Sequence, residues 1–416
     1  MLRPPFVLRD VIHATIDFPE DALGAVALDV LQTRPFQRLR RLHQLGLSKL
    51  IFPGAEHSRF AHSLGAYQLV RRAMSELDGR RLIDDMAAED RMALGLAAML
   101  HDLGHGIFSH TAERIWGFHH ETVTDRLILE HPDLSEVWSR HAVDGPALAR
   151  RIVAIRHGGD LAPEHAWMHD LVSSQADVDR LDYLLRDAYM TGVRYAGFDL
   201  DWLMRHLTRV TWRSRSRIAF EDKAVDALGQ VLMSRLHMYK NVYEHRTARI
   251  YDAMLHGLML RLGTLPRQAL EAVGLTWLVA PMGEDLEAFV ARDDYAMWEA
   301  LKILAQADIP DPIVRELAAD LLSDQRWDGD LEEVPLEPAR WVEERFRAPY
   351  ARGRLYVEDP EAQILLNSRQ GVRPLSEDPR GLRLQYAESP AMLEIRRPAR
   401  HPWYAMNPAR NDRVAP

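Results

Sequence analysis

Met99-Leu100-His101-Asp102-Leu103-Gly104-His105-Gly106 is the stretch of sequence that decides the fold. The apolar run Met92–Leu100 predicts a helix that ends in a His-Asp doublet, and a glycine-flanked histidine follows it. Imidazole and carboxylate groups are ligands that divalent metal ions accept. Adjacent helical residues point about 100° apart, so His101 and Asp102 can share an ion only near the end of the helix. The two glycines would let the following backbone bend close to such an ion.

The composition is that of a globular protein with a sizeable core. The chain has 416 residues, of which 47% are hydrophobic and 27% are charged. No apolar run approaches the roughly 20 residues that cross a bilayer, and the N-terminus lacks the apolar segment of a signal peptide. The chain contains no cysteine, so a metal site must use His, Asp, Glu and water. We therefore expect a cytoplasmic protein without a membrane span. The net charge of −9 argues against a protein that coats nucleic acid.

The hydrophobic pattern predicts a mainly α-helical fold. The first twenty residues alternate apolar and polar side chains and predict a short hairpin. Helical periodicity follows from Ala22 to about Leu260 and continues in weaker form to about Leu322. Beyond Trp327 the chain predicts a mixed region with acidic, proline-rich turns and a loose tail over the last dozen residues. Short β-like runs in this region lie at Arg354–Val357, Ile364–Leu366 and Met392–Arg396.

Histidines and acidic residues crowd one part of the chain. Seven of the 19 histidines lie between residues 57 and 120. His62 and a distant carboxylate could join His101 and Asp102 in a two-His, two-Asp site, which would leave positions open for water and a phosphate oxygen. The distant carboxylate would come from a later acidic helix. Spacing alone leaves Asp177 and Asp179 as alternatives.

The pattern His62…His101-Asp102…Asp179 resembles that of the HD-domain phosphohydrolases. More narrowly, the chain resembles the deoxynucleoside triphosphate triphosphohydrolases, including the vertebrate enzyme that joins a SAM domain to an HD domain. The likeness spans most of residues 7–255, and we expect no SAM domain before this core. The matching stretches are Pro35–Arg40, Gln44–Gly46, Phe52–Gly65, His101–His110, His120-Glu121 and Asp177–Asp187.

The resemblance implies a helical HD-domain core over residues 1–260 around a divalent ion, followed by a helical, then mixed α/β region over residues 261–416. The family's metal ligands map onto His62, His101, Asp102 and Asp179, which selects Asp179 over the alternative. Ligand type does not choose among Fe, Mn, Mg, Co, Ni and Zn. The family reaction cleaves a dNTP between the α-phosphate and the 5′ oxygen, which yields deoxynucleoside and tripolyphosphate.

The resemblance also implies roles for the remaining histidines. By position, His110 is our candidate for the general acid that protonates the departing 5′ oxygen. His120, oriented by Glu121, resembles a second catalytic pair, and His105 lies close enough in sequence to contact a phosphate oxygen.

Substrate-binding positions follow from the same likeness. Positions that hold the triphosphate match Arg59, Arg180 and Tyr183, and Arg246 could serve the phosphates as well. Positions around the sugar match Gln44, Leu45, Tyr243 and Asp187. An aromatic ring packed under C2′ would leave no space for a 2′-hydroxyl, and a carboxylate suits the 3′-hydroxyl because it only accepts hydrogen bonds.

The chain departs from the family where the vertebrate enzyme binds an activating guanine nucleotide. Gln37 and Arg40 are kept, but Gln32 replaces a carboxylate that reads guanine, and Phe6 replaces a basic residue. A carboxylate accepts from two guanine N–H groups, whereas glutamine offers one acceptor and a donor. We therefore expect little dependence on GTP.

The resemblance implies a homo-oligomer, either a dimer or a tetramer, that binds a nucleotide. Two alternatives remain. An HD-domain phosphohydrolase could act on another nucleotide, such as an NTP, an alarmone, a nucleoside monophosphate or a modified nucleotide. A regulator that binds nucleotides with little turnover is the second, and the histidines at 110 and 120 argue against it.

Overall fold

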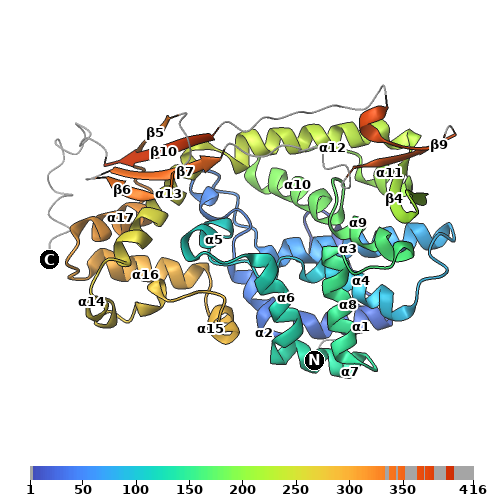
Figure 1. Ribbon diagram of the computed structural model, residues 1–416, viewed down its shortest axis with the longest axis horizontal. Helices are drawn as coiled ribbons and strands as arrows, with labels where there is room; N and C mark the ends of the chain where they lie inside the picture. Colours follow the sequence, from blue (N-terminus) through green and yellow to red (C-terminus); the bar gives the residue numbers. More distant parts are fainter. Residues whose placement is uncertain are drawn as a thin grey trace. The chain divides into compact units, whose positions relative to one another are not determined.

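The structure is a computed structural model that describes residues 3–332, 337–342, 345–351, 363–369, 371–378 and 390–397. Helices dominate these residues, as the sequence predicts, and the strands form an N-terminal hairpin and two small sheets (Figure 1). The described chain divides into two compact units. The first takes residues from 1–243, 281–297 and 355–387, and the second takes residues from 244–280, 298–354 and 388–416.

The first unit is mainly helical. Its helices are α1 (Ala22–Leu31), α2 (Arg34–Arg38), α3 (Arg59–Gly79), α4 (Ala88–Leu100), α5 (His110–Trp116), α6 (His120–Glu130), α7 (Pro132–His141), α8 (Gly145–His157), α9 (Ala166–Val172), α10 (Val178–Thr191), α11 (Leu200–Arg205), α12 (Val225–Met238) and α15 (Leu286–Val290). α3 packs against both α4 and α10, and α4 also packs against α8. These contacts bring the His-Asp doublet and the later acidic helix to one place.

Local sequence explains which face of α4 is buried and how α10 begins and ends. Every side chain of Met92–Leu100 is buried, so the apolar run that the sequence shows is the core face of α4. In α10, the carboxylate of Asp177 accepts a hydrogen bond from the amide of Arg180 and caps the N-terminus. Gly192 ends the helix with a φ of 77°, which a residue without a Cβ atom adopts freely. Asp177 is therefore occupied as a cap.

Two sets of strands belong to the first unit. β1 (Phe6–Asp10) and β2 (Ala14–Phe18) form the predicted hairpin, with Phe6 opposite Phe18. A four-stranded sheet has the order β3-β4-β8-β9. Its strands are β3 (Leu207–Trp212), β4 (Arg215–Glu221), β8 (Leu365–Ser368) and β9 (Gly371–Pro374).

The β3–β4 hairpin corrects our expectation of continuous helices to residue 260. Thr, Val, Ile and Phe are frequent in its strands, and such residues favour a pleated, half-buried surface. Arg213 and Ser214 join the strands with φ values of 48° and 61°, and two central residues with positive φ are typical of a tight hairpin turn.

The second unit packs helices against a small antiparallel sheet. Its helices include α13 (Arg246–Leu262), α14 (Arg267–Glu271) and α17 (Pro312–Leu322), and α16 (Asp294–Gln306) begins in the first unit. The sheet order is β5-β10-β7-β6. The strands are β5 (Asp328–Glu332), β6 (Arg340–Val342), β7 (Arg345–Ala351) and β10 (Pro390–Arg396).

The predicted C-terminal strands agree with the described residues where they can be compared. The run Ile364–Leu366 overlaps β8, and Met392–Arg396 lies in β10. The run Arg354–Val357 and the predicted tail lie outside the described residues. Among the helices that the structure describes, none combines the length and the apolar character that a membrane span requires.

Candidate active site

Two histidines and one aspartate converge in the first unit, and we call them the His62–His101–Asp179 trio. The Nε2 atoms of His62 and His101 are 3.1 Å apart. Oδ1 of Asp179 lies 2.9 Å from Nε2 of His62 and 3.3 Å from Nε2 of His101. Two ligand atoms bound at about 2.1 Å to one ion are separated by roughly 3.0 to 3.4 Å in octahedral or tetrahedral geometry. The trio therefore has the spacing of three ligands around a single ion.

Hydrogen bonds on the far side of both rings direct Nε2 lone pairs into the trio. Nδ1 of His101 donates to the carbonyl oxygen of Ala98 at 2.8 Å, and Nδ1 of His62 donates to Oδ2 of Asp182 at 2.8 Å. Because Nδ1 carries the proton, each neutral ring presents a lone pair at Nε2. Two lone pairs and a carboxylate oxygen repel one another at these distances unless positive charge lies between them. The donor set thus fits a divalent ion.

The carboxylates of the site also favour positive charge on the two rings. Burial alone would lower the pKa of His62, but hydrogen bonds to Asp179 and Asp182 outweigh burial and raise that pKa to about 10. At His101, burial lowers the pKa, whereas the negative charges of Asp102 and Asp179 raise it. The two charges outweigh burial, so the pKa of His101 is raised. Burial would raise the pKa of Asp179, but the two histidines lower it. The trio therefore holds positive charge, carried either by protons or by an ion.

The carboxylate of Asp182 connects the trio to the N-terminal hairpin. This side chain is fully buried. Its Oδ1 accepts from Nε2 of His13 at 2.7 Å, and Arg186 donates to both oxygens at 2.9 Å. Gly65, one turn after His62 in α3, leaves room for this carboxylate, because a Cβ atom there would lie 1.9 Å from Oδ1 of Asp182. The turn between β1 and β2 thus supports one residue of the trio.

Asp102 adjoins the trio and forms an ion pair with Arg59. Its Oδ1 lies 3.4 Å from Nε2 of His101 and 3.2 Å from Nε2 of His105. Its Oδ2 accepts from Nη1 of Arg59, whose Nε donates to the hydroxyl of Ser109 at 3.0 Å. Asp102 thus stands between the trio and the segment that follows the doublet.

The glycines of the doublet segment serve packing, whereas we expected them to bring the backbone close to an ion. A Cβ atom on Gly104 would lie 2.2 Å from the carbonyl oxygen of His120 and 2.4 Å from the amide nitrogen of Thr124. A Cβ atom on Gly106 would lie 2.7 Å from Cβ of Ala112. The glycines therefore let this loop pack closely against α5 and α6.

A second group of imidazoles follows the doublet along the chain. The rings of His105 and His120 stack with centroids 4.0 Å apart, and the His110 ring lies 5.0 and 5.5 Å from them. Glu113 accepts from Nδ1 of His110 at 2.7 Å and from Nδ1 of His120 at 2.5 Å. These bonds engage Nδ1 of both rings, and Nε2 of each ring takes no part in them. Burial and the charge of Arg59 lower the pKa of His105 well below its usual value, so this ring is neutral.

Glu113 takes the place that we predicted for Glu121 as the partner of His120. Glu121 is exposed in the first turn of α6, and no hydrogen bond joins it to His120 within the described ranges. Burial would raise the pKa of Glu113, but the hydrogen bonds of His110 and His120 lower it, so the carboxylate is ionised. Glu113 was not predicted from the sequence although a signal was present: it follows His110 by three residues, and side chains three apart on a helix meet.

The predicted sugar residues Tyr243 and Asp187 lie together. The ring centroid of Tyr183 is 6.2 Å from that of His62 and 6.0 Å from that of Tyr243. The Tyr243 hydroxyl donates to Oδ2 of Asp187 at 2.8 Å, and Nε2 of His57 lies 2.7 Å from Oδ1. Burial raises the pKa of Tyr183 and of Tyr243, so both hydroxyls stay protonated. His57 was predicted only as a member of the histidine-rich stretch, without a role of its own.

Two arginines lie near the same tyrosines. Arg180 forms an ion pair with Asp177. The positive charges of Arg180 and Arg235 both lower the pKa of Tyr183, against the larger effect of burial. Arg235 is buried in α12 and donates from Nη1 to the side chain of Gln175 at 2.5 Å. Its Nε has no partner among the residues that the structure describes. Arg235 was not predicted, because a single arginine on an amphipathic helix gives no sign of what lies opposite.

The remaining predicted residues differ in their surroundings. Gln44 and Leu45 are half-buried. The amide of Gln44 donates to the carbonyl oxygen of His57 at 2.9 Å, and its side-chain Oε1 is buried without a donor in the described chain. Arg246 belongs to the second unit, where it begins α13 and donates to the carbonyl oxygen of Gly329 in β5.

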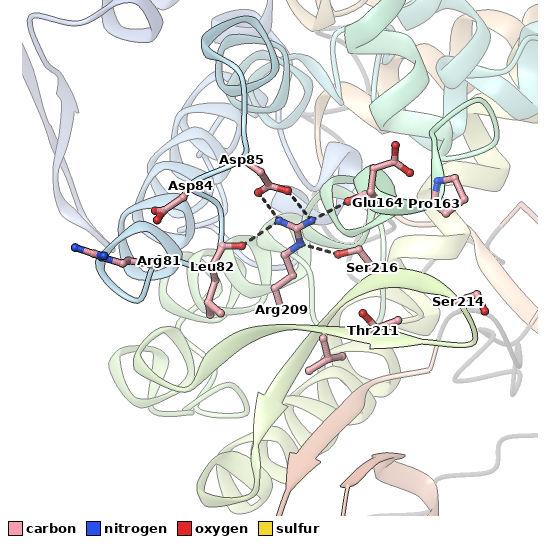
Figure 2. A pocket seen from close by; sticks show the side chains of 11 residues that line it. Arg81, Leu82, Asp84, Asp85, Pro163, Glu164, Arg209, Thr211, Ser214 and Ser216 are labelled. Atoms are coloured by element: carbon pink, nitrogen blue, oxygen red, sulfur yellow. Dashed lines mark hydrogen bonds and ion pairs between the residues drawn. The ribbon is translucent and has the colours of Figure 1, made fainter.

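A polar pocket of about 610 Å³ lies elsewhere in the first unit (Figure 2). Arg209 lies within it and donates to Asp85 at 2.7 and 3.2 Å, to the hydroxyl of Ser216 at 2.7 Å, and to the carbonyl oxygens of Leu82 and Glu164 at 3.0 and 3.1 Å. These five bonds use every N–H group of the guanidinium, so Arg209 has no donor left for an anion. None of the predicted site residues lines this pocket.

Family models match most of the first unit. The HD domain matches residues 59–187, and the HD associated region matches residues 198–308. The chain is an HD-domain protein. The HD match includes both the trio and the second group of imidazoles, His105, His110 and His120, with their partner Glu113. The residues that converge in space are therefore those of the domain itself.

The HD-domain protein is similar to several curated proteins over part of their length. It is 37% identical to the uncharacterised protein YwfO of Bacillus subtilis over 256 residues, which cover 61% of this chain and 55% of that one. It is 26% identical to the deoxynucleoside triphosphate triphosphohydrolase SAMHD1 of Danio rerio over 331 residues, which cover 72% of this chain and 51% of that one. The chain thus spans about half the length of the curated relatives that it matches.

Solved structures share the fold of the HD-domain protein. The crystal structure of a phosphohydrolase from Bacteroides thetaiotaomicron has a TM-score of 0.77 at 24% identity, and the match covers 94% of this chain and all of that chain. A hypothetical protein from Aquifex aeolicus has a TM-score of 0.70 at 24% identity, with coverage of 94% and 96%. At this identity the likeness shows the fold alone.

Proposed function

We propose that this HD-domain protein is a metal-dependent phosphohydrolase that cleaves deoxynucleoside triphosphates into deoxynucleoside and tripolyphosphate. One observation carries the proposal: the imidazoles bound to Glu113 connect to the trio through His105 and Asp102. This arrangement sets acid–base groups beside a cation site, as hydrolysis of a phosphate ester with a poor leaving group requires. The likeness to dNTP triphosphohydrolases over 72% of the chain supports the substrate class.

Under this proposal His62, His101, Asp102 and Asp179 hold a divalent ion. When bound, such an ion supplies an activated water and polarises a phosphoryl oxygen. Asp182 keeps the proton of His62 on Nδ1, so that Nε2 stays directed into the trio. The ion can be Fe, Mn, Mg, Co, Ni or Zn, because imidazole and carboxylate ligands accept all of these.

His110 is the proposed general acid. The ionised carboxylate of Glu113 accepts from Nδ1 and stabilises the protonated ring, so the proton to be transferred lies on Nε2. The departing 5′ oxygen takes that proton as the ester bond breaks. His120 shares the carboxylate. Neutral His105 has a single N–H group, which Nε2 directs at Oδ1 of Asp102 at 3.2 Å, so we propose that this ring links the trio to His110 and His120.

Basic and aromatic residues near the trio are proposed to hold the triphosphate. Arg59, Arg180 and Tyr183 are the residues predicted from the sequence, and Arg246 remains a further proposal. Buried Arg235 joins this group, because its Nε has no protein partner among the described residues and a phosphate oxygen would satisfy it.

Tyr243, Asp187, Gln44 and Leu45 are proposed to surround the sugar. The Tyr243 ring would exclude a 2′-hydroxyl. The unpaired, buried Oε1 of Gln44 is an acceptor that a sugar hydroxyl could satisfy, as is the carboxylate of Asp187. We further propose that the protein is a cytoplasmic homo-oligomer, a dimer or tetramer, with little dependence on GTP.

A nucleotide panel with product identification tests the function. Purified protein is incubated with each dNTP, each NTP and an alarmone, with Mn²⁺ or Mg²⁺, and the products are separated by anion exchange. We expect deoxynucleoside and tripolyphosphate from dNTPs and no product from a His101→Ala variant. Release of orthophosphate or pyrophosphate would contradict the proposed bond cleavage, and turnover of another nucleotide alone would support the alternative substrate.

A further inference from the structure

The turn that precedes His110 has an unusual backbone. Phe108 and Ser109 have φ values of 51° and 60°, and Ser109 has a ψ of −122°. Residues with a Cβ atom rarely adopt positive φ, and two in succession need surroundings that fix them. Gly46 leaves space for the backbone of this turn, because a Cβ atom at position 46 would lie only 3.0 Å from the carbonyl oxygen of Phe108. The strained turn directly precedes the imidazole proposed as the general acid.

One distant carboxylate holds this turn. Oδ1 of Asp294 accepts a hydrogen bond from the amide of Phe108 at 2.8 Å. Its Oδ2 accepts from the amide of His43 at 2.7 Å and from Nδ1 of the same residue at 2.8 Å. The hydroxyl of Ser109 in turn donates to the carbonyl oxygen of His43 at 3.2 Å. Asp294 is fully buried, so water does not compete for these bonds.

We propose that Asp294 is a positioning residue for catalysis, which fixes the left-handed turn at Phe108 and Ser109 and thereby aims His110 at the leaving group. The inference rests on the proposed function, in which His110 gives a proton to the departing oxygen. Asp294 lies 186 residues after Phe108 and within the HD associated region. That region therefore contributes to the acid although it supplies no residue to the trio.

The side chain at this position must be a carboxylate. Three N–H groups converge on Asp294, and a carboxylate accepts from all of them because both oxygens carry only lone pairs. An asparagine would turn its NH₂ group toward at least one donor and leave that donor unsatisfied. Asp293 is a matched control, because its carboxylate contacts Arg41 and the amide of Ala296 rather than the turn.

The first arm of the test measures the turn without any turnover. Hydrogen exchange followed by mass spectrometry compares wild type with Asp294→Asn and Asp293→Asn. In wild type, the Phe108 amide is expected to exchange at least a hundredfold more slowly than in a free peptide. Asp294→Asn is expected to accelerate exchange in residues 105–112 at least tenfold, with α3 unchanged and with no such change in Asp293→Asn. Unprotected exchange at Phe108 in wild type overturns the proposal, even if the variant does not fold.

The second arm measures catalysis. On a dNTP, Asp294→Asn is expected to lower kcat at least tenfold, with KM within about threefold and Mn²⁺ affinity unchanged. On bis(4-nitrophenyl) phosphate, whose leaving group needs no acid, the loss is expected to be under threefold. His110→Ala should show the same selectivity, and the double variant should lose no more than His110→Ala alone. Equal losses of kcat on both substrates overturn the proposal. A loss of kcat that merely tracks a loss of thermal stability, in Asp293→Asn as well as in Asp294→Asn, also overturns it.

Relief of the strain provides a rescue. Ser109→Gly removes the Cβ atom that makes the turn costly, so the turn needs less support. Ser109→Gly in the wild-type background is the reference, because it measures separately the loss of the hydroxyl that contacts Arg59 and His43. In the Asp294→Asn background it is expected to recover at least threefold in kcat on the dNTP. No recovery, together with unchanged exchange in the turn, contradicts the positioning role. If wild type leaves dNTPs intact, the proposed function fails, whereas the exchange arm still decides whether Asp294 holds the turn.

Discussion

Gly65 shows how a single residue can determine the chemistry of its neighbours. It follows His62 by one helical turn, and its missing side chain is the space in which Oδ1 of Asp182 lies. Asp182 in turn fixes the proton of His62 on Nδ1. A histidine whose Nδ1 is held by a carboxylate is oriented for a metal at Nε2, and loss of such a partner typically costs 10–100-fold in affinity.

We predict that Gly65→Ala weakens metal binding. The added methyl group would displace Asp182, so His62 would lose its orientation, and the apparent Kd for Mn²⁺ is expected to rise about tenfold or more. Isothermal titration measures this. Gly79→Ala, in the same helix but with no atom within 4 Å of the added Cβ, should keep wild-type affinity. An unchanged Kd in Gly65→Ala would show that Asp182 can move without effect.

Residues could be predicted from the sequence where a short motif contains them. His62, His101, Asp102 and Asp179 all belong to recognisable stretches, and the structure brings them close together. Asp182 lies in such a stretch as well, but nothing in the sequence says that it binds His62. His13 and Asp294 act through contacts with segments 169 and 186 residues away, and no local pattern reports such a contact.

At the scale of elements, the N-terminal hairpin has a clear connection with the trio. The turn between β1 and β2 presents His13 to Asp182, and Asp10 accepts from Arg186 in the same network. The alternating sequence predicted the hairpin but gave it no function. The hairpin thus holds the carboxylate of Asp182, and Asp182 in turn orients the His62 ring.

We predict that His13→Ala raises the Kd for Mn²⁺ about tenfold, because Oδ1 of Asp182 loses a donor and the carboxylate gains freedom. His13→Gln, whose amide can donate from a similar position, is expected to recover most of the affinity. Titration with Mn²⁺ compares the three proteins, and circular dichroism checks that each is folded. If His13→Gln binds as weakly as His13→Ala, the hydrogen bond is not the cause.

α17 contains a carboxylate that should make stability depend on pH. Burial raises the pKa of Asp320 to about 6, although Trp327 donates to it at 2.8 Å and opposes the rise. A raised folded-state pKa gives stability that is fully present below the unfolded value of 3.8 and is lost as the pH rises through about 6. Asp320 is partly solvated, so the loss is discounted to about 1 kcal/mol.

Asp320→Asn is therefore expected to raise the midpoint of thermal unfolding by a few degrees at pH 8 and to change little at pH 4. Asn keeps an oxygen for Trp327 and carries no charge. Differential scanning calorimetry at the two pH values makes the comparison. Asp311→Asn is the control at the N-terminus of the same helix and should destabilise at pH 8, because it loses the ion pair with Arg261 while asparagine can keep the cap of α17. A gain at pH 4 equal to that at pH 8 would refute the charge as the cause.

Helices were predicted more reliably than strands because of their length. A long amphipathic segment such as α3 repeats its pattern many times, whereas β3 has six residues and could equally be one helical turn and a half. The pairing of β4 with β8, far along the chain, is a tertiary contact without a local sequence signal. The boundary that we placed at residue 260 stays a prediction.

At the scale of the whole molecule, metal binding should add to folding stability. A ligand that binds only the folded state stabilises that state by about 2.7 kcal/mol when the free ligand concentration is about a hundred times the Kd. We predict that a chelator lowers the thermal midpoint and abolishes hydrolysis, and that added Mn²⁺ restores both. His101→Ala should not respond to Mn²⁺. A midpoint and an activity that are both insensitive to chelation would exclude a role for the ion.

The distance in sequence between Phe108 and Asp294 has a consequence for biosynthesis. During translation, all three residues of the trio have left the ribosome once Asp179 has emerged. The proposed acid lacks its support until Asp294 emerges, 186 residues after the turn that it holds. Polysome-bound chains stalled before residue 294 should therefore hydrolyse dNTPs at least tenfold more slowly than released full-length chains. The order of synthesis would thus limit the consumption of nucleotides by unfinished chains.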